Sequence, residues 1–270
     1  FFHYFSSAIK IKNSIFSWFI SNYDQLMSIS KNQIKLITSL SQKKYRLKYK
    51  LFIAEGVKVV RELIASSYEL ETLFCTEGFD SEVSDQKVVR ISESDLKKIS
   101  NLKTPNKVLG LFRIPDQKPP QKSNLIIALD AINDPGNLGT IIRLCDWFGV
   151  AQIVCSMDTV DSFNQKVVQA SMGSLTRVSI HYLDVENYLI NTHLPTFIAD
   201  MDGENVYTAP LPKEGILVLG NEANGVSEKI KKQVTTKIAI PRFGDIQETE
   251  SLNVATAAAI LLSEFKRGSL

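Results

Sequence analysis

The sequence predicts an α/β protein with a mainly parallel sheet covered by helices on both faces, preceded by a smaller α/β domain. Three observations support this prediction. Short apolar runs alternate with segments of helical periodicity after residue 124. A Pro-rich polar linker, residues 115–124, separates this part from the first. Polar loops containing glycine follow three of the apolar runs, as in open α/β sheets that build a site at the strand ends.

Size and composition indicate a globular protein. The chain has 270 residues, of which 44% are hydrophobic and 22% charged, enough for one large or two ordinary domains. A formal net charge of +2 is too small to name a partner. The three cysteines lie in apolar runs without C-x-x-C spacing, which predicts buried, reduced thiols and a cytoplasmic location. The three histidines lack metal-ligand spacing, so no metal is expected.

Residues 1–26 stand apart from the rest of the chain. They lack an initiator Met and are rich in aromatic residues, but lysines and asparagines interrupt the apolar run. This disfavours a membrane-spanning helix or a signal peptide, and no membrane partner is expected. The regular pattern begins at Met27. We interpret the segment as a leader, either a mis-assigned translation start or a poorly ordered extension.

The first domain is predicted to span residues 27–114. Its basic stretch, residues 31–50, holds seven Lys and Arg residues and no acid, and a helix with a positive face followed by a basic loop is expected there. Such a stretch is by default a solvated surface. Because Tyr45 and Tyr49 lie among the cations, contact with RNA is the competing interpretation. The candidate RNA-binding residues are Lys31, Lys35, Lys43, Lys44, Arg46 and Lys48.

The remaining elements follow from the hydrophobic pattern. In the first domain, strands are expected at 51–55, 70–75, 88–91 and 108–114, and helices at 57–64 and 94–99. In the second domain, residues 125–270, strands are expected at 125–129, 152–155, 178–182, 197–199, 216–219 and 237–240. Helices between them are expected at 138–148, 165–172, 185–190 and 227–234, with a terminal helix from Ser251.

The first polar loop places Asn137 at a helix entrance and Arg143 six residues later. An Arg behind a Gly-rich turn suits a phosphate or carboxylate ligand, although Asp-Pro-Gly-Asn is also ordinary turn chemistry and Arg143 could be a surface residue. In a regular helix, a spacing of six directs the two side chains to roughly opposite sides. The two would share one side only if the first residues were still loop.

The usual nucleotide-binding signatures are absent from the sequence. A Walker A loop needs Lys after its second Gly, where this chain has Val226, and no G-x-G-x-x-G follows the first strand of the second domain. In the third loop, Ser251 fits the N-cap of the terminal helix. That helix is rich in alanine, which suits either a dimer face or simply a good helix former.

Three segments resemble, in order, the motifs of the SpoU/TrmH family (SPOUT superfamily) of RNA ribose 2′-O-methyltransferases. They are Asn133-Asp-Pro-Gly-Asn-Leu-Gly-Thr-Ile-Ile-Arg143, Leu219-Gly-Asn-Glu-Ala-Asn-Gly-Val-Ser227, and Ile240-Pro with Glu250-Ser-Leu-Asn-Val254. The first domain resembles the family's substrate-binding domain of ribosomal-protein type, most clearly at residues 52–58. In the third motif, Gly244 and Glu250 are six residues apart, a longer loop than family members commonly have.

The resemblance implies a trefoil-knotted catalytic domain that binds S-adenosylmethionine (AdoMet) and works as a homodimer. Carried over position by position, Leu219, Gly220, Ile240 and Leu252 would line the adenosine pocket. The positions that match the family's active site are Asn137, Arg143, Glu222, Ser251 and Asn253.

Methylation of a ribose needs a 2′-hydroxyl that is deprotonated and closely positioned. The resemblance nominates Arg143 to activate it; because a guanidinium stays protonated, Arg143 could instead orient the ribose and stabilise the developing alkoxide. The resemblance favours ribosomal RNA as the substrate. The alternatives are a tRNA 2′-O-methyltransferase, a non-catalytic RNA-binding module with the same fold, and a small-molecule α/β enzyme.

Overall fold

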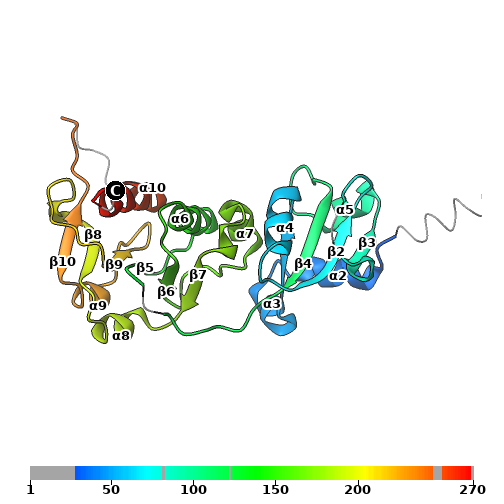
Figure 1. Ribbon diagram of the computed structural model, residues 1–270, viewed down its shortest axis with the longest axis horizontal. Coiled ribbons are helices and arrows are strands. Elements are labelled where there is room, and N and C mark those ends of the chain that lie inside the picture. The colour runs from blue at the N-terminus through cyan, green and yellow to red at the C-terminus, as the bar shows by residue number, and fades with distance from the viewer. Residues whose placement is uncertain (1–27, 81–82, 122, 246–250, 269–270) are drawn as a thin grey trace, which may run out of the picture. The chain divides into compact units, whose positions relative to one another are not determined.

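The structure is a computed structural model that describes residues 28–80, 83–121, 123–245 and 251–268. The leader expected at residues 1–26 therefore lies outside the described residues. Contacts divide the chain into two compact units (Figure 1). The first contains the described residues up to Ile64 together with Glu69–Arg113, and the second contains Ala65–Tyr68 and the residues from Ile114 onwards. Between Arg113 and Leu125 the described residues form no helix or strand.

The first unit is a four-stranded mixed sheet with helices packed against it. Its strands lie in the order β1-β4-β2-β3; β4 is antiparallel to β1 and β2, whereas β3 is parallel to β2. The elements are α2 (Lys31–Ser39), α3 (Lys43–Tyr49), β1 (Leu51–Glu55), α4 (Val57–Ile64), β2 (Leu70–Cys75), η1 (Asp85–Lys87), β3 (Val88–Arg90), α5 (Glu93–Ile99) and β4 (Val108–Arg113).

The basic stretch folds differently from the prediction of one helix followed by a loop. Ser30 caps α2 with a capping box, in which its hydroxyl accepts from the Gln33 amide and Gln33 bonds back to the Ser30 amide. A turn after Ser39 leads into the second helix, α3. Ile37 and Leu40 are buried in the core with residues of β1 and α5. The basic stretch therefore consists of two short helices joined by a turn, and the apolar side chains of Ile37 and Leu40 hold it against the core.

The second unit is built around a six-stranded sheet whose pairings are all parallel, in the order β10-β8-β9-β5-β6-β7. Its elements are β5 (Leu125–Leu129), α6 (Pro135–Trp147), β6 (Gln152–Cys155), α7 (Gln165–Ser171), η2 (Ser174–Thr176), β7 (Ser179–Tyr182), α8 (Val185–Ile190), β8 (Thr196–Asn205), β9 (Gly215–Leu219), α9 (Glu228–Lys231), β10 (Thr236–Ala239) and α10 (Val254–Arg267). The predicted fold class, a mainly parallel sheet with a smaller α/β unit before it, is confirmed.

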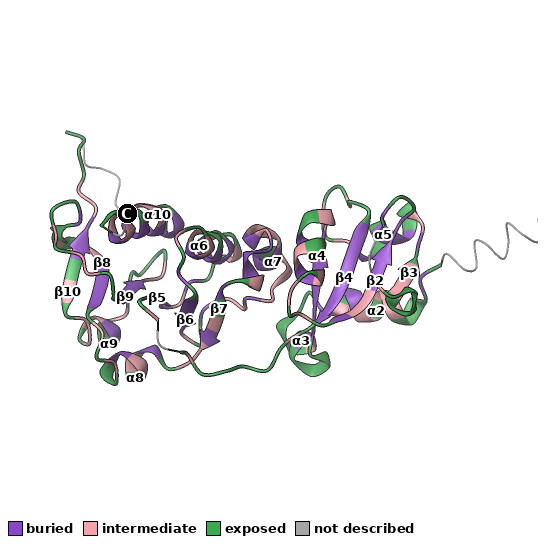
Figure 2. Ribbon diagram, in the orientation of Figure 1, coloured by how far each residue is buried: buried purple, intermediate pink, exposed green. Residues whose placement is uncertain are grey.

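Helices cover both faces of this sheet, as Figure 1 shows, with α8 and α9 on one side and α6, α7 and α10 on the other. Residues of β5 and β9 are buried throughout (Figure 2). Alternate side chains of these strands, such as Ile126 and Val218, pack with α8 and α9 in one core cluster. This double coverage explains why the strands are continuous apolar runs rather than alternating patterns.

Strand β8 leaves the sheet in its middle, which the sequence did not predict. Phe197 and Ile198 pair with Thr236 and Lys237 of β10, but the next pair is Ile238 with Glu204. Residues 199–203 therefore have no partner in β10 and form an excursion from the sheet. At its end, Gly203 lies so close to the Ile238 backbone that a Cβ atom there would fall 2.5–2.7 Å from three of its atoms. The excursion and β10 are in direct backbone contact.

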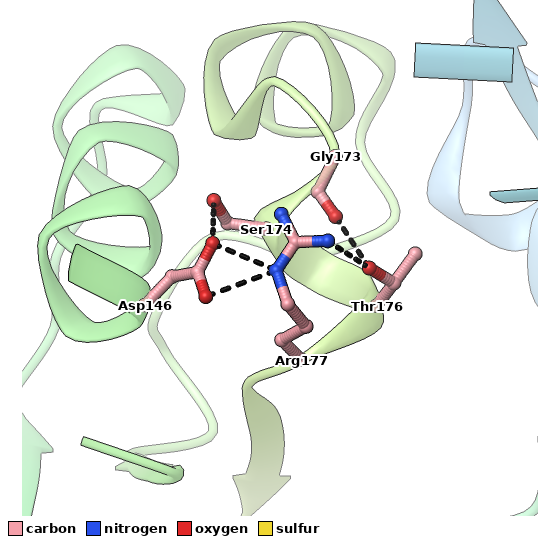
Figure 3. A network of polar contacts seen from close by, with 5 residues as sticks. All are labelled: Asp146, Gly173, Ser174, Thr176 and Arg177. Atoms are coloured by element: carbon pink, nitrogen blue, oxygen red, sulfur yellow. Dashed lines mark hydrogen bonds and ion pairs between the residues drawn. The ribbon is translucent and has the colours of Figure 1, made fainter. Parts of the chain in front are cut away.

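A polar network fixes the carboxyl-terminal half of α6 (Figure 3). The Arg177 Nε donates to both carboxylate oxygens of Asp146 at 3.0 Å, and the Ser174 hydroxyl donates to Oδ2 at 2.8 Å. The Arg177 Nη1 also donates to the Thr176 hydroxyl, which donates to the Gly173 carbonyl. The network joins α6 to the segment around η2. Helix α6 is also the helix that carries Asn137 and Arg143.

The three cysteines, Cys75, Cys145 and Cys155, are buried and form no disulfide, as the sequence predicted. Burial is the main cause that raises the pKa of each thiol. Within the described ranges no helix has the length and apolar character needed to cross a membrane.

Candidate functional site

The first two polar loops meet at one edge of the parallel sheet. Strands β5 and β9 are neighbours, so the residues that follow them emerge side by side. The Asn221 Nδ2 donates to the Ala131 carbonyl at 2.7 Å, and the Ser227 amide donates to Asp130 Oδ2 at 2.7 Å. The sequence pattern did not indicate this role for Asp130 and Asn221. They cross-link the two loops.

A chain of three side chains joins all three polar loops. The Asn253 Nδ2 donates to Asn137 Oδ1 at 2.9 Å, and the Asn137 Nδ2 donates to Glu222 Oε1 at 2.8 Å. Asn137 belongs to the first of the three motif segments, Glu222 to the second and Asn253 to the third. Three of the five residues predicted for the active site are thus in direct contact, although 85 and 116 positions separate the bonded pairs.

The helix cap sets the direction of this chain. The Asn253 Oδ1 accepts from the amides of Ala255 and Thr256, at 2.9 and 3.2 Å. Only its Nδ2 is then left to donate to Asn137, whose own Nδ2 must turn to Glu222. The cap of α10 thus fixes the orientation of the side-chain amides of both Asn253 and Asn137. This series of hydrogen bonds ends at the Glu222 carboxylate, of which one oxygen accepts from Asn137.

Asn253, rather than Ser251, caps α10. The sequence predicted a helix from Ser251, but α10 begins at Val254 and Asn253 is its N-cap. Both residue types are good caps, and only the structure distinguishes two candidates two positions apart. Ser251 instead lines a cavity next to the network.

Arg143 lies on α6 but not in this network. The helix begins at Pro135, with Asp134 as its N-cap, and not at Leu138 as predicted. Asn137 is therefore already helical, and six residues of helix rotate Arg143 by about 600°, or 240° past one full turn. Arg143 is exposed and does not line the cavity described next. Glu222 contacts Asn137 rather than Arg143.

A cavity of about 400 Å³ opens beside the third loop. Its walls come from the β8 excursion, from β10 and the loop that follows it, and from the start of α10. Most lining side chains are apolar, and Asp200, Arg242 and Ser251 are the polar exceptions. The lining residues are Ala199, Asp200, Met201, Ile238, Ile240, Pro241, Arg242, Gly244, Ser251, Leu252, Ala257 and Leu261.

Two of the four residues predicted to contact the cofactor line this cavity. They are Ile240 and Leu252, whereas Leu219 is fully buried in the sheet and Gly220 lies outside the lining. A Cβ atom at Gly220 would overlap the backbone of Gly225 and Val226. The backbone amides of Asn221 and Gly225 bond to each other's carbonyls at 2.9 Å, which closes this loop on itself. Gly220 is thus required for the tight turn of the second loop.

Asp200 is an acidic residue of the cavity wall, and no motif in the sequence indicated it. Its side chain is 18% exposed and pairs with the Lys237 Nζ at 3.1 Å. Burial acts to raise the pKa of Asp200, but bonds from the Asp202 amide and from Lys237 outweigh it and hold the pKa below the usual value of 3.8. The carboxylate is charged at neutral pH.

The candidate RNA-binding residues of the first unit fall into two groups. The five lysines are exposed, and Lys50 next to them is exposed as well. Arg46 does not fit the prediction of an RNA contact, because it is only 3% exposed and its Nη1 donates to the carbonyls of Leu40 and Ser41 at 2.8 and 2.9 Å. Its guanidinium satisfies the carbonyls at the end of α2. Arg46 therefore has a structural role and is not accessible to RNA.

No cluster of three or more His, Cys, Asp or Glu residues suited to a metal ion is present in the described part of the chain. The polar groups of the site are the amides of Asn137 and Asn253, the carboxylates of Glu222 and Asp200, the Ser251 hydroxyl and the Arg242 guanidinium, beside an apolar cavity. An apolar cavity with a few polar groups suits a flat organic ligand with hydrogen-bonding edges. The fold and site define an α/β protein that binds such a ligand at the carboxyl edge of a parallel sheet.

Comparison with known proteins identifies this class. Residues 124–263 match the SpoU rRNA Methylase family, and residues 31–110 match the MRM3-like substrate binding domain. The chain belongs to the SpoU rRNA methylase family.

Similar proteins cover nearly the whole chain. The 23S rRNA (guanosine(2553)-2′-O)-methyltransferase RlmP of Bacillus subtilis is 27% identical over 255 residues, covering 88% of this chain and 97% of that protein. A TrmH-family structure from Porphyromonas gingivalis is 40% identical with a TM-score of 0.81, covering 89% and 99% of the two chains. The AdoMet-bound rRNA methyltransferase of Sinorhizobium meliloti is 27% identical with a TM-score of 0.79, covering 90% and 97%.

Proposed function

We propose that this protein transfers a methyl group from AdoMet to a ribose 2′-hydroxyl of ribosomal RNA, with release of S-adenosylhomocysteine and of the hydroxyl proton. The observation that carries the proposal is the hydrogen-bonded chain Asn253–Asn137–Glu222, which brings the three family motifs together. Leu252, the residue before Asn253, lines the cavity, so the network and the cavity are continuous along the backbone.

The cavity residues fit the proposed cofactor. Apolar walls from Ile238, Ile240 and Leu252 suit the faces of an adenine ring, and a volume of about 400 Å³ is within the range of small-molecule sites. When bound, AdoMet supplies an electrophilic methyl group. The proposed cofactor contacts are Ile240 and Leu252 through the cavity, with Leu219 and Gly220 holding the second loop in place.

The polar side chains have the chemistry to position a ribose. Glu222 has a carboxylate oxygen beyond the one bonded to Asn137, and it can accept a hydrogen bond from a sugar hydroxyl. Ser251, on the cavity wall, can bond to the same sugar or to the cofactor. Arg143 supplies the positive charge that stabilises the developing alkoxide. Asn137 and Asn253 hold this geometry rather than exchange protons.

The position of Arg143 supports a homodimer in this proposal. In its own chain Arg143 is exposed and lies outside the cavity lining, so a second copy is needed to bring the Arg143 guanidinium to the site. We further propose that the second unit forms the trefoil knot of the family. Mixing an Arg143→Ala protein with a Glu222→Ala protein tests the dimer. Recovery of activity in the mixture supports sharing of the site, and two inactive parents that stay inactive when mixed contradict it.

Ribosomal RNA is the proposed substrate because the first unit matches a substrate-binding domain and the relative RlmP is named for 23S rRNA. We propose that residues 27–114 hold this RNA through Lys31, Lys35, Lys43, Lys44 and Lys48, and that residues 125–270, beyond the linker at 115–124, carry out the transfer. A ribosomal substrate agrees with the cytoplasmic location expected from the three free thiols.

Transfer of label from methyl-labelled AdoMet tests the function. We expect label in ribosomal RNA, at a 2′-O-methyl site, and a loss of about 10²-fold in rate for Arg143→Ala. The matched control is Arg267→Ala, an exposed arginine of the same unit that lies at the end of α10. No transfer to ribosomal or transfer RNA would refute the proposal. RNA affinity without AdoMet binding in calorimetry would instead identify a non-catalytic RNA-binding protein.

A further inference from the structure

Helix α3 presents two parallel tyrosine rings. Tyr45 and Tyr49 are one helical turn apart, and their ring centroids lie 6.3 Å apart with an interplanar angle of 14°. Tyr45 is half-buried against the core of the first unit, whereas Tyr49 is 41% exposed. The inner ring is thus supported by the protein, and the outer ring extends the stack towards solvent.

Lysines surround these rings. The Lys44 Nζ lies 4.9 Å from the centroid of Tyr45, and the Lys48 Nζ lies 5.4 Å from that of Tyr49. We call Lys44, Tyr45, Lys48 and Tyr49 the α3 platform. No acidic residue occurs between residues 28 and 54, and neither lysine forms an ion pair with another described residue. The positive charge of the platform is therefore available to an anionic partner.

Hydrogen bonds of Arg46 hold the helix that carries the platform in place. Arg46 is buried between its two lysines in sequence and ties α3 to the end of α2 through the carbonyls of Leu40 and Ser41. Lys50 ends the helix in a left-handed conformation, with φ of 53°. A fixed aromatic surface loses little conformational entropy when a ring stacks on it.

We propose that the α3 platform stacks an unpaired nucleobase of the RNA substrate on Tyr49, while Lys44 and Lys48 bind the adjacent phosphates. The inference rests on the proposed function in taking RNA as the partner. Aromatic rings interleaved with cations are the combination by which proteins bind single-stranded nucleic acid, because every base has a face that can stack. A base inside a duplex has no free face, so the ligand must be a loop, bulge or strand end.

Binding of a single-stranded RNA oligonucleotide that contains 2-aminopurine tests the proposal. The fluorescence of this base falls when it stacks. With the full-length chain, we expect quenching and a loss of about tenfold in affinity for Tyr49→Ala. Tyr49→Phe keeps the ring and should retain both. Leu47→Ala is the matched control, since Leu47 is an exposed apolar residue of the same helix, at 54%, but has no aromatic face.

Salt dependence and duplex binding separate stacking from charge. Lys48→Ala should reduce the slope of log affinity against log salt by about 0.7, whereas Tyr49→Ala should leave the slope unchanged. Affinity for the same sequence as a duplex should not respond to Tyr49→Ala. Equal effects of Tyr49→Ala and Leu47→Ala, or no quenching by the wild-type chain, would overturn the proposal.

Failure of this inference is distinguishable from failure of the proposed function. If the wild-type chain methylates RNA and Tyr49→Ala changes neither affinity nor quenching, the platform is refuted and the methyltransferase stands. If Tyr49-dependent quenching is observed but no RNA is methylated, the platform stands and the proposed reaction does not.

Discussion

Substitution of Gly203 by Ala should destabilise the second unit through a backbone clash. The added Cβ would lie 2.5, 2.6 and 2.7 Å from the carbonyl carbon, nitrogen and Cα of Ile238, whereas ordinary contacts are 3.4–4 Å. All three atoms belong to the backbone, so no side-chain rotation can relieve the contact and β8 must move away from β10. Overpacking of this kind costs about 1–3 kcal/mol. For a unit of this size that corresponds to a decrease in Tm of about 2–12 °C.

The assay is differential scanning calorimetry of the full chain, in which AdoMet identifies the transition of the second unit by raising its Tm. Gly268→Ala is the matched control, because it makes the same change in the same unit with no atom within 4 Å. Since residues 199–201 line the cavity, Gly203→Ala should also weaken AdoMet binding. Equal Tm values for Gly203→Ala and Gly268→Ala would refute the proposed close approach of β8 and β10.

Three further predictions follow from the contacts. Asn253→Ala removes the cap of α10 and should lower the stability of the second unit by about 1 kcal/mol in denaturant unfolding, whereas Ser251→Ala should not; equal losses would restore Ser251 as the cap. Arg46→Ala leaves two carbonyls unsatisfied and should cost about 1–3 kcal/mol in the first unit, measured by Tm, while Lys48→Ala should change it little. Folding lowers the pKa of Asp200, so its carboxylate contributes stability that is present above its ordinary pKa of 3.8 and is lost as the pH falls through the lower folded pKa. Asp200→Asn should therefore reduce the dependence of the unfolding free energy on pH, measured between pH 6 and pH 2. An unchanged pH profile in this variant would contradict the prediction.

The sequence predicted the elements that depend on local pattern. Residues 125–129 and 216–219 are apolar without alternation, and both are central parallel strands. The polar loops after them were expected to meet because the carboxyl ends of parallel strands share one edge of a sheet. The contact of Asn137 with Glu222 bears out that geometric argument.

Features that depend on register or burial could not be predicted in this way. The β8 excursion results from a shift in pairing between Lys237 and Ile238, which no local propensity records. The charge pattern predicted an RNA contact for Arg46 as for its neighbouring lysines, but Arg46 is buried and has a structural role. Cross-links such as that from Asn221 to Ala131 depend on the conformation of two loops together.

The order of motifs along the chain has a consequence for protein synthesis. Asn137 is translated well before its partner Asn253, which lies 116 residues later. A nascent chain that has not yet reached Asn253 cannot orient the Asn137 amide, and the α10 wall of the cavity is also missing. Translation that terminates within this interval would release fragments unable to modify the RNA, so catalytic competence arises only after the last motif has been made.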